Sequence, residues 1–483
     1  MIDIKRALEA LDWLLSSPDT ASAARTTIRG FTQSRKISLR DVLLFYVFRS
    51  AETTNKDMAL YFSKLEKPNV SKQAMFKALN KLNPDVFPFI IHSFAKEFYM
   101  HQEYHTLDDY LILACDGSVL DLPNSSELRE YYGGVTNMYI KDNSQVKKPQ
   151  AKCSILVDVL NHVILDSVIA PYKTSELPML FEHLKNCEEV LQGKKIILLC
   201  DRYYGSADLF LYNALRDYKF IVRGKTNFYK EYVNSIERDG IIEVPFNRAW
   251  IKRLKYEDNR AYAERVGALS LRVIRNTYEY TLTDGKATTP PTVTDSIYFT
   301  NLESNSFSTE RILELYHVQR WDNETVYFDI KNHLEAERFN STKYNIVTNE
   351  IYGKILCFSV CGLFYEAACE DSKENSHIRE PSNKYEYIPN MKNITDTLRA
   401  EHRFLKLLSD FKMYEREIMP AEYLSSLVRD FAKTKVPVRP GRHYRRWGRW
   451  MTWIPTAKFR VDGRRNPPIK KLYNGPGYLT TQR

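Results

Sequence analysis

The chain has 483 residues, a net charge of +10 and 43% hydrophobic residues. This length predicts two to four domains with a sizeable core. The seven cysteines are scattered, and no His or Cys completes a zinc site with Cys357 and Cys361, so we expect buried thiols in a reducing compartment. We expect neither a signal peptide nor a membrane span, because the longest apolar stretch, residues 355–364, is too short. These features predict a cytoplasmic protein without a membrane partner.

The positive charge lies in the C-terminal tail, residues 433–483. The tail holds 14 lysines and arginines against one acid, Asp462, so its net charge is +13 and that of the first 432 residues is −3. Aromatic residues alternate with its arginines, a composition that suits both stacking on nucleic-acid bases and pairing with phosphates. A solvated tail without a partner is the alternative. The arginines that we expect to contact DNA are Arg442, Arg445, Arg446 and Arg449.

Residues 1–105 have the apolar periodicity of helices. Ser38 is a candidate N-cap for a buried helix. A second helical run, residues 57–62, is followed by a break at residues 67–69 and by a helix for which Ser71 is a candidate N-cap. A helix, a short turn and a capped helix form the outline of a helix-turn-helix motif, which predicts DNA contact. Any two packed helices share that outline, so plain packing stays open as the alternative.

Two short apolar runs each end in an aspartate, Asp116 and Asp201, and both runs predict buried strands. Between them, two strand-like runs flank Asn161 and His162, which predicts a hairpin. A helix and a further strand follow Asp201. This order predicts an α/β fold with a mixed sheet, in which ligands bind at the strand ends of one edge. The runs are residues 111–116, 153–160, 163–170, 194–201, 207–218 and 220–223.

The rest of the chain divides by composition. Between Thr226 and Ile297 the pattern is strand-like and interrupted, and it is too long for a plain loop, so we predict a β-rich insertion. Ser308 is the candidate N-cap of the next helix, and a long apolar helix over residues 349–370 should pack on the sheet. The predicted domains are a helical N-terminal DNA-binding domain (1–105), an α/β core in two parts (106–224 and 300–372), the β-rich insertion (225–299), a helical C-terminal region (373–432) and the basic tail (433–483).

The helix predicted after Ser308 has one face of polar and aromatic residues. Spacings of 4, 8, 11 and 15 residues return to the same side of a single helix. On spacing alone, a solvated helix with ion pairs between successive turns explains this face as well as a functional site does. The residues on the face are Tyr316, Arg320, Glu324, Tyr327 and Lys331.

Asp116, Asp201 and Glu324 are three carboxylates, two at predicted strand ends and one on a helix that can cross the sheet edge. Hard oxygen ligands of this kind suit Mg²⁺ or Mn²⁺. Two such ions about 3.5–4 Å apart activate a water or a 3′-hydroxyl for an in-line phosphoryl displacement. Arg320 and Lys331, on the same helix face, are placed to bind the flanking phosphates.

Other interpretations of these acids stay open. Asp is frequent in turns, so each aspartate taken alone is more simply a strand-end or turn residue. Asp121 and Asp158 are further acids in the same predicted strands, and the pattern does not exclude them from a metal site.

Several short motifs occur in order along residues 38–370. They are Asp116-Gly-Ser-Val-Leu-Asp-Leu-Pro, Tyr132-Gly133, Asp201-Arg-Tyr-Tyr-Gly-Ser, Thr300-Asn-Leu, and Tyr316 with Arg320, Glu324 and Lys331. The set resembles the insertion-sequence DDE transposases that carry the YREK signature (the IS-four family). The resemblance implies a ribonuclease-H-like catalytic core that a β-rich insertion interrupts, between helical N- and C-terminal regions.

The resemblance also implies a cut-and-paste reaction. Such an enzyme cleaves DNA at the terminal inverted repeats of its insertion sequence and joins the 3′-hydroxyls to target DNA, with two Mg²⁺ or Mn²⁺ ions and as a homodimer in the synaptic complex. Asp116, Asp201 and Glu324 match the metal-binding catalytic triad of the family. Arg320, Glu324 and Lys331 match the spacing of its signature.

The tyrosine of the signature departs from the pattern. The family has two residues between Tyr and Arg, whereas three separate Tyr316 from Arg320, and His317 stands in the expected place. Tyr316 is our first choice for the phosphate contact because it lies one turn before Arg320, and His317 is its competitor. Family members also stack a flipped base on a tryptophan of the insertion, which matches Trp250 here. A buried core tryptophan is the alternative.

Two other functions share these residues. One is a non-catalytic DNA-binding protein derived from a transposase, which the three intact carboxylates argue against. The other is a ribonuclease-H-like nuclease that cuts without strand transfer, and only analysis of the products separates it from a transposase.

Overall fold

The structure is a computed structural model that describes residues 2–28, 30–32, 36–50, 52–134, 148–225, 227–280, 283–284, 287–288, 292–374 and 385–438. The predicted DNA-contacting arginines of the tail lie outside the described residues, as do residues 439–483 as a whole.

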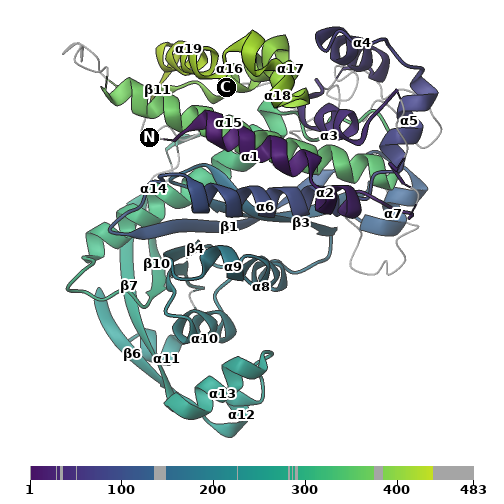
Figure 1. The fold of residues 1–483 in the computed structure, drawn as a ribbon. Coiled ribbons are helices and arrows are strands. Elements are labelled where there is room, and N and C mark those ends of the chain that lie inside the picture. The colour runs from purple at the N-terminus through teal and green to yellow at the C-terminus, as the bar shows by residue number, and fades with distance from the viewer. Residues whose placement is uncertain are drawn as a thin grey trace.

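A mixed sheet forms the centre of the molecule (Figure 1). Within the described residues it has eight strands in the order β3-β2-β1-β4-β5-β10-β7-β6. Strand β1 pairs antiparallel with β2 and parallel with β4, and β4 pairs parallel with β5. The first five strands therefore have the arrangement of a ribonuclease-H-like fold, and the predicted mixed α/β fold is confirmed. Their bounds are β1 (Tyr110–Asp121), β2 (Gln150–Asp158), β3 (Val163–Pro171), β4 (Lys195–Cys200) and β5 (Lys219–Arg223).

The apolar runs become the central strands because both faces of the sheet are covered. Residues 196–200 of β4 are completely buried, as a strand between two helical layers must be. The predicted hairpin joins β2 to β3, and His162 takes the left-handed conformation in its turn, with φ +52°. Asn161 is buried in the same turn and donates a hydrogen bond to Asp158 at 2.7 Å.

The insertion continues the sheet. Strand β10 pairs antiparallel with β5, and β7 and β6 follow it to the edge. The predicted boundary after residue 299 falls at the end of β10, so the core and the insertion share one sheet. The insertion also contains three short helices among its described residues, seen at the bottom of Figure 1. Its elements are α11 (Lys230–Val233), β6 (Asp239–Pro245), α12 (Arg248–Ile251), α13 (Glu257–Val266), β7 (Ala268–Tyr280), the small strands β8 (Thr283–Asp284) and β9 (Ala287–Thr288), and β10 (Thr292–Thr300).

Helices cover both faces of the ribonuclease-H-like part (Figure 1). One face carries α8 (Glu176–Asn186), α9 (Glu188–Leu191) and α10 (Ala207–Leu215), and the other carries α6 (Val86–His101), α14 (Thr309–Phe328) and α15 (Tyr344–Glu374). Helix α15 is long and apolar enough to cross a membrane, but 94% of its most apolar window is buried inside the protein. It therefore has the surroundings of a core helix.

The helices from the two ends of the chain form one layer around α15 (Figure 1). The predicted N-caps are confirmed: Ser38 Oγ accepts a hydrogen bond from the Asp41 amide, and Ser71 Oγ accepts one from the Ala74 amide. The elements of the layer are α1 (Ile4–Ser16), α2 (Pro18–Ala23), α3 (Leu39–Phe48), α4 (Thr54–Lys64), α5 (Lys72–Asn80), β11 (Glu386–Pro389), α16 (Met391–Ala400), α17 (His402–Ser409), α18 (Phe411–Ile418), α19 (Pro420–Lys433) and β12 (Lys435–Val438). The short helix α7 (Ser126–Tyr132) lies after β1.

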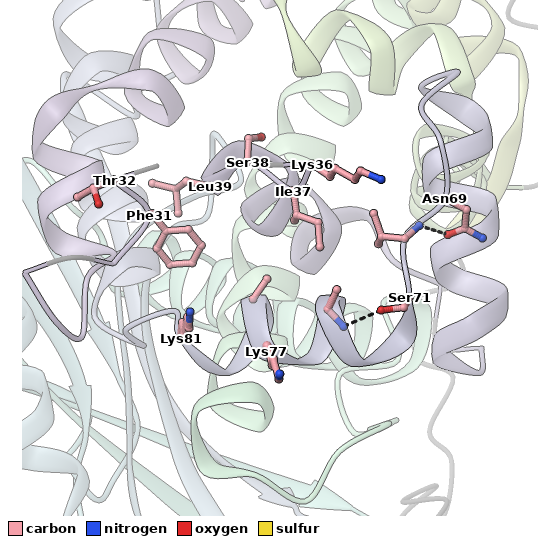
Figure 2. Close-up of a pocket in the computed structure, with 13 residues that line it drawn as sticks. Phe31, Thr32, Lys36, Ile37, Ser38, Leu39, Asn69, Ser71, Lys77 and Lys81 are labelled. Atoms are coloured by element: carbon pink, nitrogen blue, oxygen red, sulfur yellow. Dashed lines mark hydrogen bonds between the residues drawn. The ribbon is translucent and has the colours of Figure 1, made fainter. Parts of the chain in front are cut away.

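A cavity of about 570 Å³ lies beside the predicted helix-turn-helix, between residues 31–32 and 36–39 on one side and α5 on the other (Figure 2). The side chains of Phe31 and Ile37 line it, and three lysines, Lys36, Lys77 and Lys81, stand among its lining residues. A basic, partly apolar hollow beside α5 is compatible with the predicted DNA contact of this region.

A buried ion-pair network joins the N-terminal helices to α15. Arg49, directly after α3, pairs with Asp57 on α4 and with Glu350 on α15, and all three side chains are at most 4% exposed. Lys354 Nζ donates to the Arg49 carbonyl oxygen at 2.5 Å, and burial lowers the pKa of Lys354 well below its usual value. The network holds two helices from distant parts of the sequence together.

Replacing Glu350 with alanine should lower the free energy of unfolding by about 3–5 kcal/mol, because it leaves Arg49 buried with only one carboxylate. Denaturant unfolding of the full chain measures the change. Glu415→Ala is the matched control, since its pair with Lys5 is exposed and should contribute no more than about 1 kcal/mol. Equal losses for the two variants would show that the buried network does not hold the layer.

Candidate active site

The structure places Asp116 and Asp201 side by side. Strands β1 and β4 run parallel, and Cys115 pairs with Cys200 in their register. Each aspartate follows its cysteine directly, so the two occupy neighbouring positions on strands that lie about 4.7–4.9 Å apart. One detail differs from the prediction: β1 does not end at Asp116 but continues to Asp121, because its second half still pairs with β2.

The two competing acids are engaged elsewhere. Asp121 is 5% exposed and accepts hydrogen bonds from Lys148 at 2.6 Å and from Gln150 at 2.5 Å. Asp158 is fully buried at the other end of the sheet, where Tyr99 donates to it at 2.8 Å, and burial raises its pKa to about 6. Both acids therefore have structural partners of their own, away from the paired aspartates.

Two buried tyrosines hold helix α14 against strands β1 and β4 beside Asp116 and Asp201. Tyr316 Oη donates to the carbonyl oxygen of Cys200 at 3.2 Å, directly before Asp201. Tyr327 Oη donates to the carbonyl oxygens of Asp116 at 2.8 Å and of Cys153 at 3.2 Å. Burial, with contributions from the Cys153 thiol and the Asp116 carboxylate, raises the pKa of Tyr327 well above its usual value, so its hydroxyl stays a donor. The helix is thus bonded to the backbone at both aspartates.

The helix changes pitch before Lys331. The α-helix ends at Phe328, and Asp329–His333 is a π-helical turn. Lys331, the last residue of the predicted face, therefore does not follow the regular α-helical spacing of the other four. Lys331 still reaches the site: its Nζ donates to Ser118 Oγ at 2.7 Å and to the Val119 carbonyl oxygen at 2.9 Å. Its ammonium therefore lies beside β1, two residues beyond Asp116.

Arg320 and Glu324 lie on α14 between the two tyrosines, and the side chains of residues 318–324 fall outside the described residues. The predicted N-cap of α14 is confirmed, since Ser308 Oγ accepts a hydrogen bond from the Arg311 amide. Among the side chains that the structure describes, no three His, Cys, Asp or Glu residues form a group able to hold a metal ion, and Glu324 is not part of that set.

With this geometry in view, comparison with known proteins places the chain. Residues 108–360, from the start of β1 to the middle of α15, match the family model described as "Transposase DDE domain". The chain belongs to this DDE transposase family. The matched segment includes both aspartates, the insertion and all of α14.

Individual proteins match this DDE transposase over shorter segments or at low sequence identity. An Escherichia coli (strain K12) protein named "Putative transposase InsZ" is 30% identical over 115 residues, which is 24% of this chain and 35% of that protein. The match thus spans about a third of the relative's length. A solved structure titled "Cryo-EM structure of piggyBac transposase synaptic complex with hairpin DNA (SNHP)" has 11% sequence identity and a TM-score of 0.44, and the match covers 91% of this chain and 87% of that one.

Three other predicted DNA contacts of this DDE transposase domain differ in exposure. Tyr316 is 2% exposed and bonded to the backbone, whereas His317 is exposed, with Nε2 3.1 Å from Tyr298 Oη. The structure thus places the tyrosine under the helix and the histidine at its surface. Trp250 is half-buried in the insertion and stacks on Phe246, with ring centroids 4.5 Å apart.

Sequence reasoning assigned no role to two contacts of β1. The first is Tyr327, which the helical spacing placed on the correct face but did not connect to Asp116. The second is Gly117: a Cβ at this position would lie 2.6 Å from Glu176 Cδ, so the Glu176 side chain in its observed position packs against a residue without a Cβ. Glu176 is paired there with Lys152 at 2.7 Å.

Proposed function

We propose that the chain is a transposase of the YREK-signature (IS-four) kind, which cleaves DNA at the ends of an insertion sequence and joins the 3′-hydroxyls to target DNA. The observation that carries the proposal is the neighbouring placement of Asp116 and Asp201, with α14, which bears Glu324, hydrogen-bonded to the backbone at both of them. Membership of the DDE transposase family supports it.

The donor set fits divalent metal ions, because Asp116 and Asp201 supply hard oxygen ligands from adjacent strands. In the proposal they and Glu324 would hold two Mg²⁺ or Mn²⁺ ions, and such ions supply an activated oxygen nucleophile and stabilise the leaving oxygen. The chain's own tyrosines contribute position, because Tyr316 and Tyr327 bond α14, the helix that carries Glu324, to the backbone beside Asp201 and Asp116.

The cations on α14 and its π-turn would bind the phosphates that flank the cut. Arg320 and Lys331 take this role, and Lys331 is already directed at β1 by its bond to Ser118. Of the two aromatic candidates, buried Tyr316 orients the helix in our proposal, and exposed His317, which is bonded to Tyr298, is the one at the helix surface. Trp250 remains the candidate for stacking a flipped base.

The wider assembly follows from the same reaction. Cutting both ends of one element requires two active sites, so we propose a homodimer on DNA in the synaptic complex, acting in the cytoplasm. The N-terminal helices and the basic tail would bind the duplex around the terminal inverted repeats. The three-lysine cavity beside α5 lies in this N-terminal region.

The decisive experiment is analysis of the products. Purified protein is incubated with Mg²⁺ or Mn²⁺ and a plasmid whose inverted repeats are those that flank the gene. Excised element joined to a second plasmid, with short direct duplications at the joints, is the expected result. Cleavage without joining would favour the nuclease, and binding without cleavage would favour a non-catalytic DNA-binding protein.

Lys331→Ala should slow cleavage in a single-turnover assay by about ten- to a hundred-fold, because it removes one charge-assisted hydrogen bond to the substrate. Lys343→Ala is the matched control, since Lys343 is an exposed lysine paired with Glu127 beside α7 and should leave the rate unchanged. If both variants cut at the wild-type rate, Lys331 does not bind the DNA at the site.

A further inference from the structure

The turn that follows β4 presents an aromatic side chain beside Asp201. Tyr203 is 60% exposed, and its backbone amide donates to Asp201 Oδ1 at 2.7 Å. The next residue, Tyr204, is fully buried, with its hydroxyl 3.8 Å from Cys115 Sγ. The buried tyrosine anchors the turn, and its neighbour is therefore directed to solvent two residues from a candidate catalytic acid.

Two cations flank the exposed ring. The guanidinium carbon of Arg202 lies 5.4 Å from the centroid of Tyr203, and Lys225 Nζ lies 5.3 Å from it. Lys225 follows β5, the strand parallel to β4, so the three side chains gather at the carboxyl edge of the sheet where Asp201 lies. Within the described part of the chain, neither cation forms an ion pair with a carboxylate.

Packing within the protein does not account for this group. A surface cation–π contact is worth about 0.5–1 kcal/mol, and the Tyr203 ring remains 60% exposed although two cations lie near it. An exposed aromatic ring with two cations within reach suits a ligand that has a flat base with negatively charged groups next to it, which is the chemistry of a nucleotide within a strand.

We propose that Tyr203, Arg202 and Lys225 bind an unpaired nucleotide of the DNA strand next to the cut. The base stacks on Tyr203, and the phosphates on its two sides pair with Arg202 and Lys225. This inference rests on the proposed function, because it needs a DNA strand at Asp201. It adds a contact for a nucleotide that leaves its base pair beside the cut.

The test measures binding without cleavage. Full-length protein in buffer without divalent metal is titrated with two fluorescent DNAs, a blunt duplex and the same duplex with an unpaired tail at the cut position. Tyr203→Leu should weaken binding of the tailed DNA by on the order of ten-fold, and it should leave the blunt duplex unchanged. Tyr203→Phe keeps the ring and should bind as the wild type does. Tyr387→Leu, at an exposed tyrosine of β11, is the control for loss of a surface ring.

A base analogue reports the stacking itself. With 2-aminopurine in the tail, wild type and Tyr203→Phe should change its fluorescence on binding, and Tyr203→Leu should not. Arg202→Gln with Lys225→Gln should lower the salt dependence by about 1.4 in the log–log slope, which is two phosphates on a single strand. Equal affinities of Tyr203→Leu and Tyr203→Phe for the tailed DNA would overturn the proposal. Because the binding assay requires no catalysis, that result would not contradict the proposed transposition. Likewise, a failed transposition assay would not contradict binding of the tailed DNA at Tyr203.

Discussion

Alanine in place of Asp116, Asp201 or Glu324 should abolish DNA cleavage while leaving DNA binding intact. The three carboxylates are proposed to act as one unit, so losing one should cost nearly as much as losing all three, roughly 10⁴-fold or more in rate. Because Asp116 and Asp201 follow paired residues of β1 and β4, we expect the same loss of rate from replacing either one. Single-turnover cleavage with Mg²⁺ or Mn²⁺ measures the rate, and fluorescence anisotropy with labelled terminal repeats measures the affinity.

Asp109→Ala is the control for this series, because Asp109 is an exposed acid just before β1 that pairs across the surface with Lys195. It should cut at the wild-type rate. A triple variant should be no slower than the slowest single one. Normal cutting by any one of the three single variants would remove that residue from the triad and would require another acid in its place.

Local patterns were enough to predict the strands, the caps and the order of the acids. The apolar runs before Asp116 and Asp201 are strands because each must be buried on both faces, and Ser38, Ser71 and Ser308 cap helices through their own side chains. Such features depend on a few neighbouring residues. The sequence therefore predicted both the mixed sheet and the two aspartates at its edge.

Features that depend on distant pairing were not predictable in the same way. That β7 and β6 of the insertion continue the core sheet depends on their register beyond β10, and that the N-terminal and C-terminal helices form one layer depends on contacts such as that of Lys406 with Glu66. Neither leaves a periodic signal in the sequence. The same holds for the extension of β1 past Asp116, which follows from pairing with β2.

The helix face shows how a small local change alters a site assignment. Tyr316 and His317 are adjacent, so on a helix they point about 100° apart. The docking of α14 buries the tyrosine against the Cys200 carbonyl and leaves the histidine exposed, and no spacing rule decides which side docks. The π-turn after Phe328 likewise moves Lys331 off the regular face and onto Ser118.

Removing the basic tail should weaken binding to every DNA sequence. The structure sets the boundary: β12 (Lys435–Val438) pairs with β11, so a truncation should begin after Val438 to keep that hairpin. Residues 439–483 hold 12 lysines and arginines against Asp462, a net charge of +11. If six of these cations contact phosphates, their loss should lower the log–log salt slope of duplex affinity by about 5 and the affinity itself by several orders of magnitude at low salt.

A matched pair of variants separates charge from stacking in the tail. Gln in place of Arg442, Arg445, Arg446 and Arg449 should lower the slope by up to about 3.6, because each phosphate contact contributes about 0.9. Alanine in place of the three tail tryptophans, Trp447, Trp450 and Trp453, should leave the slope unchanged, since a neutral ring releases no counterion. Neither set should change which terminal repeat is preferred, because phosphate contacts position a protein without specifying sequence. Equal slopes for the full chain and the truncation would show that the tail does not touch DNA, and the +11 charge would then require another anionic partner.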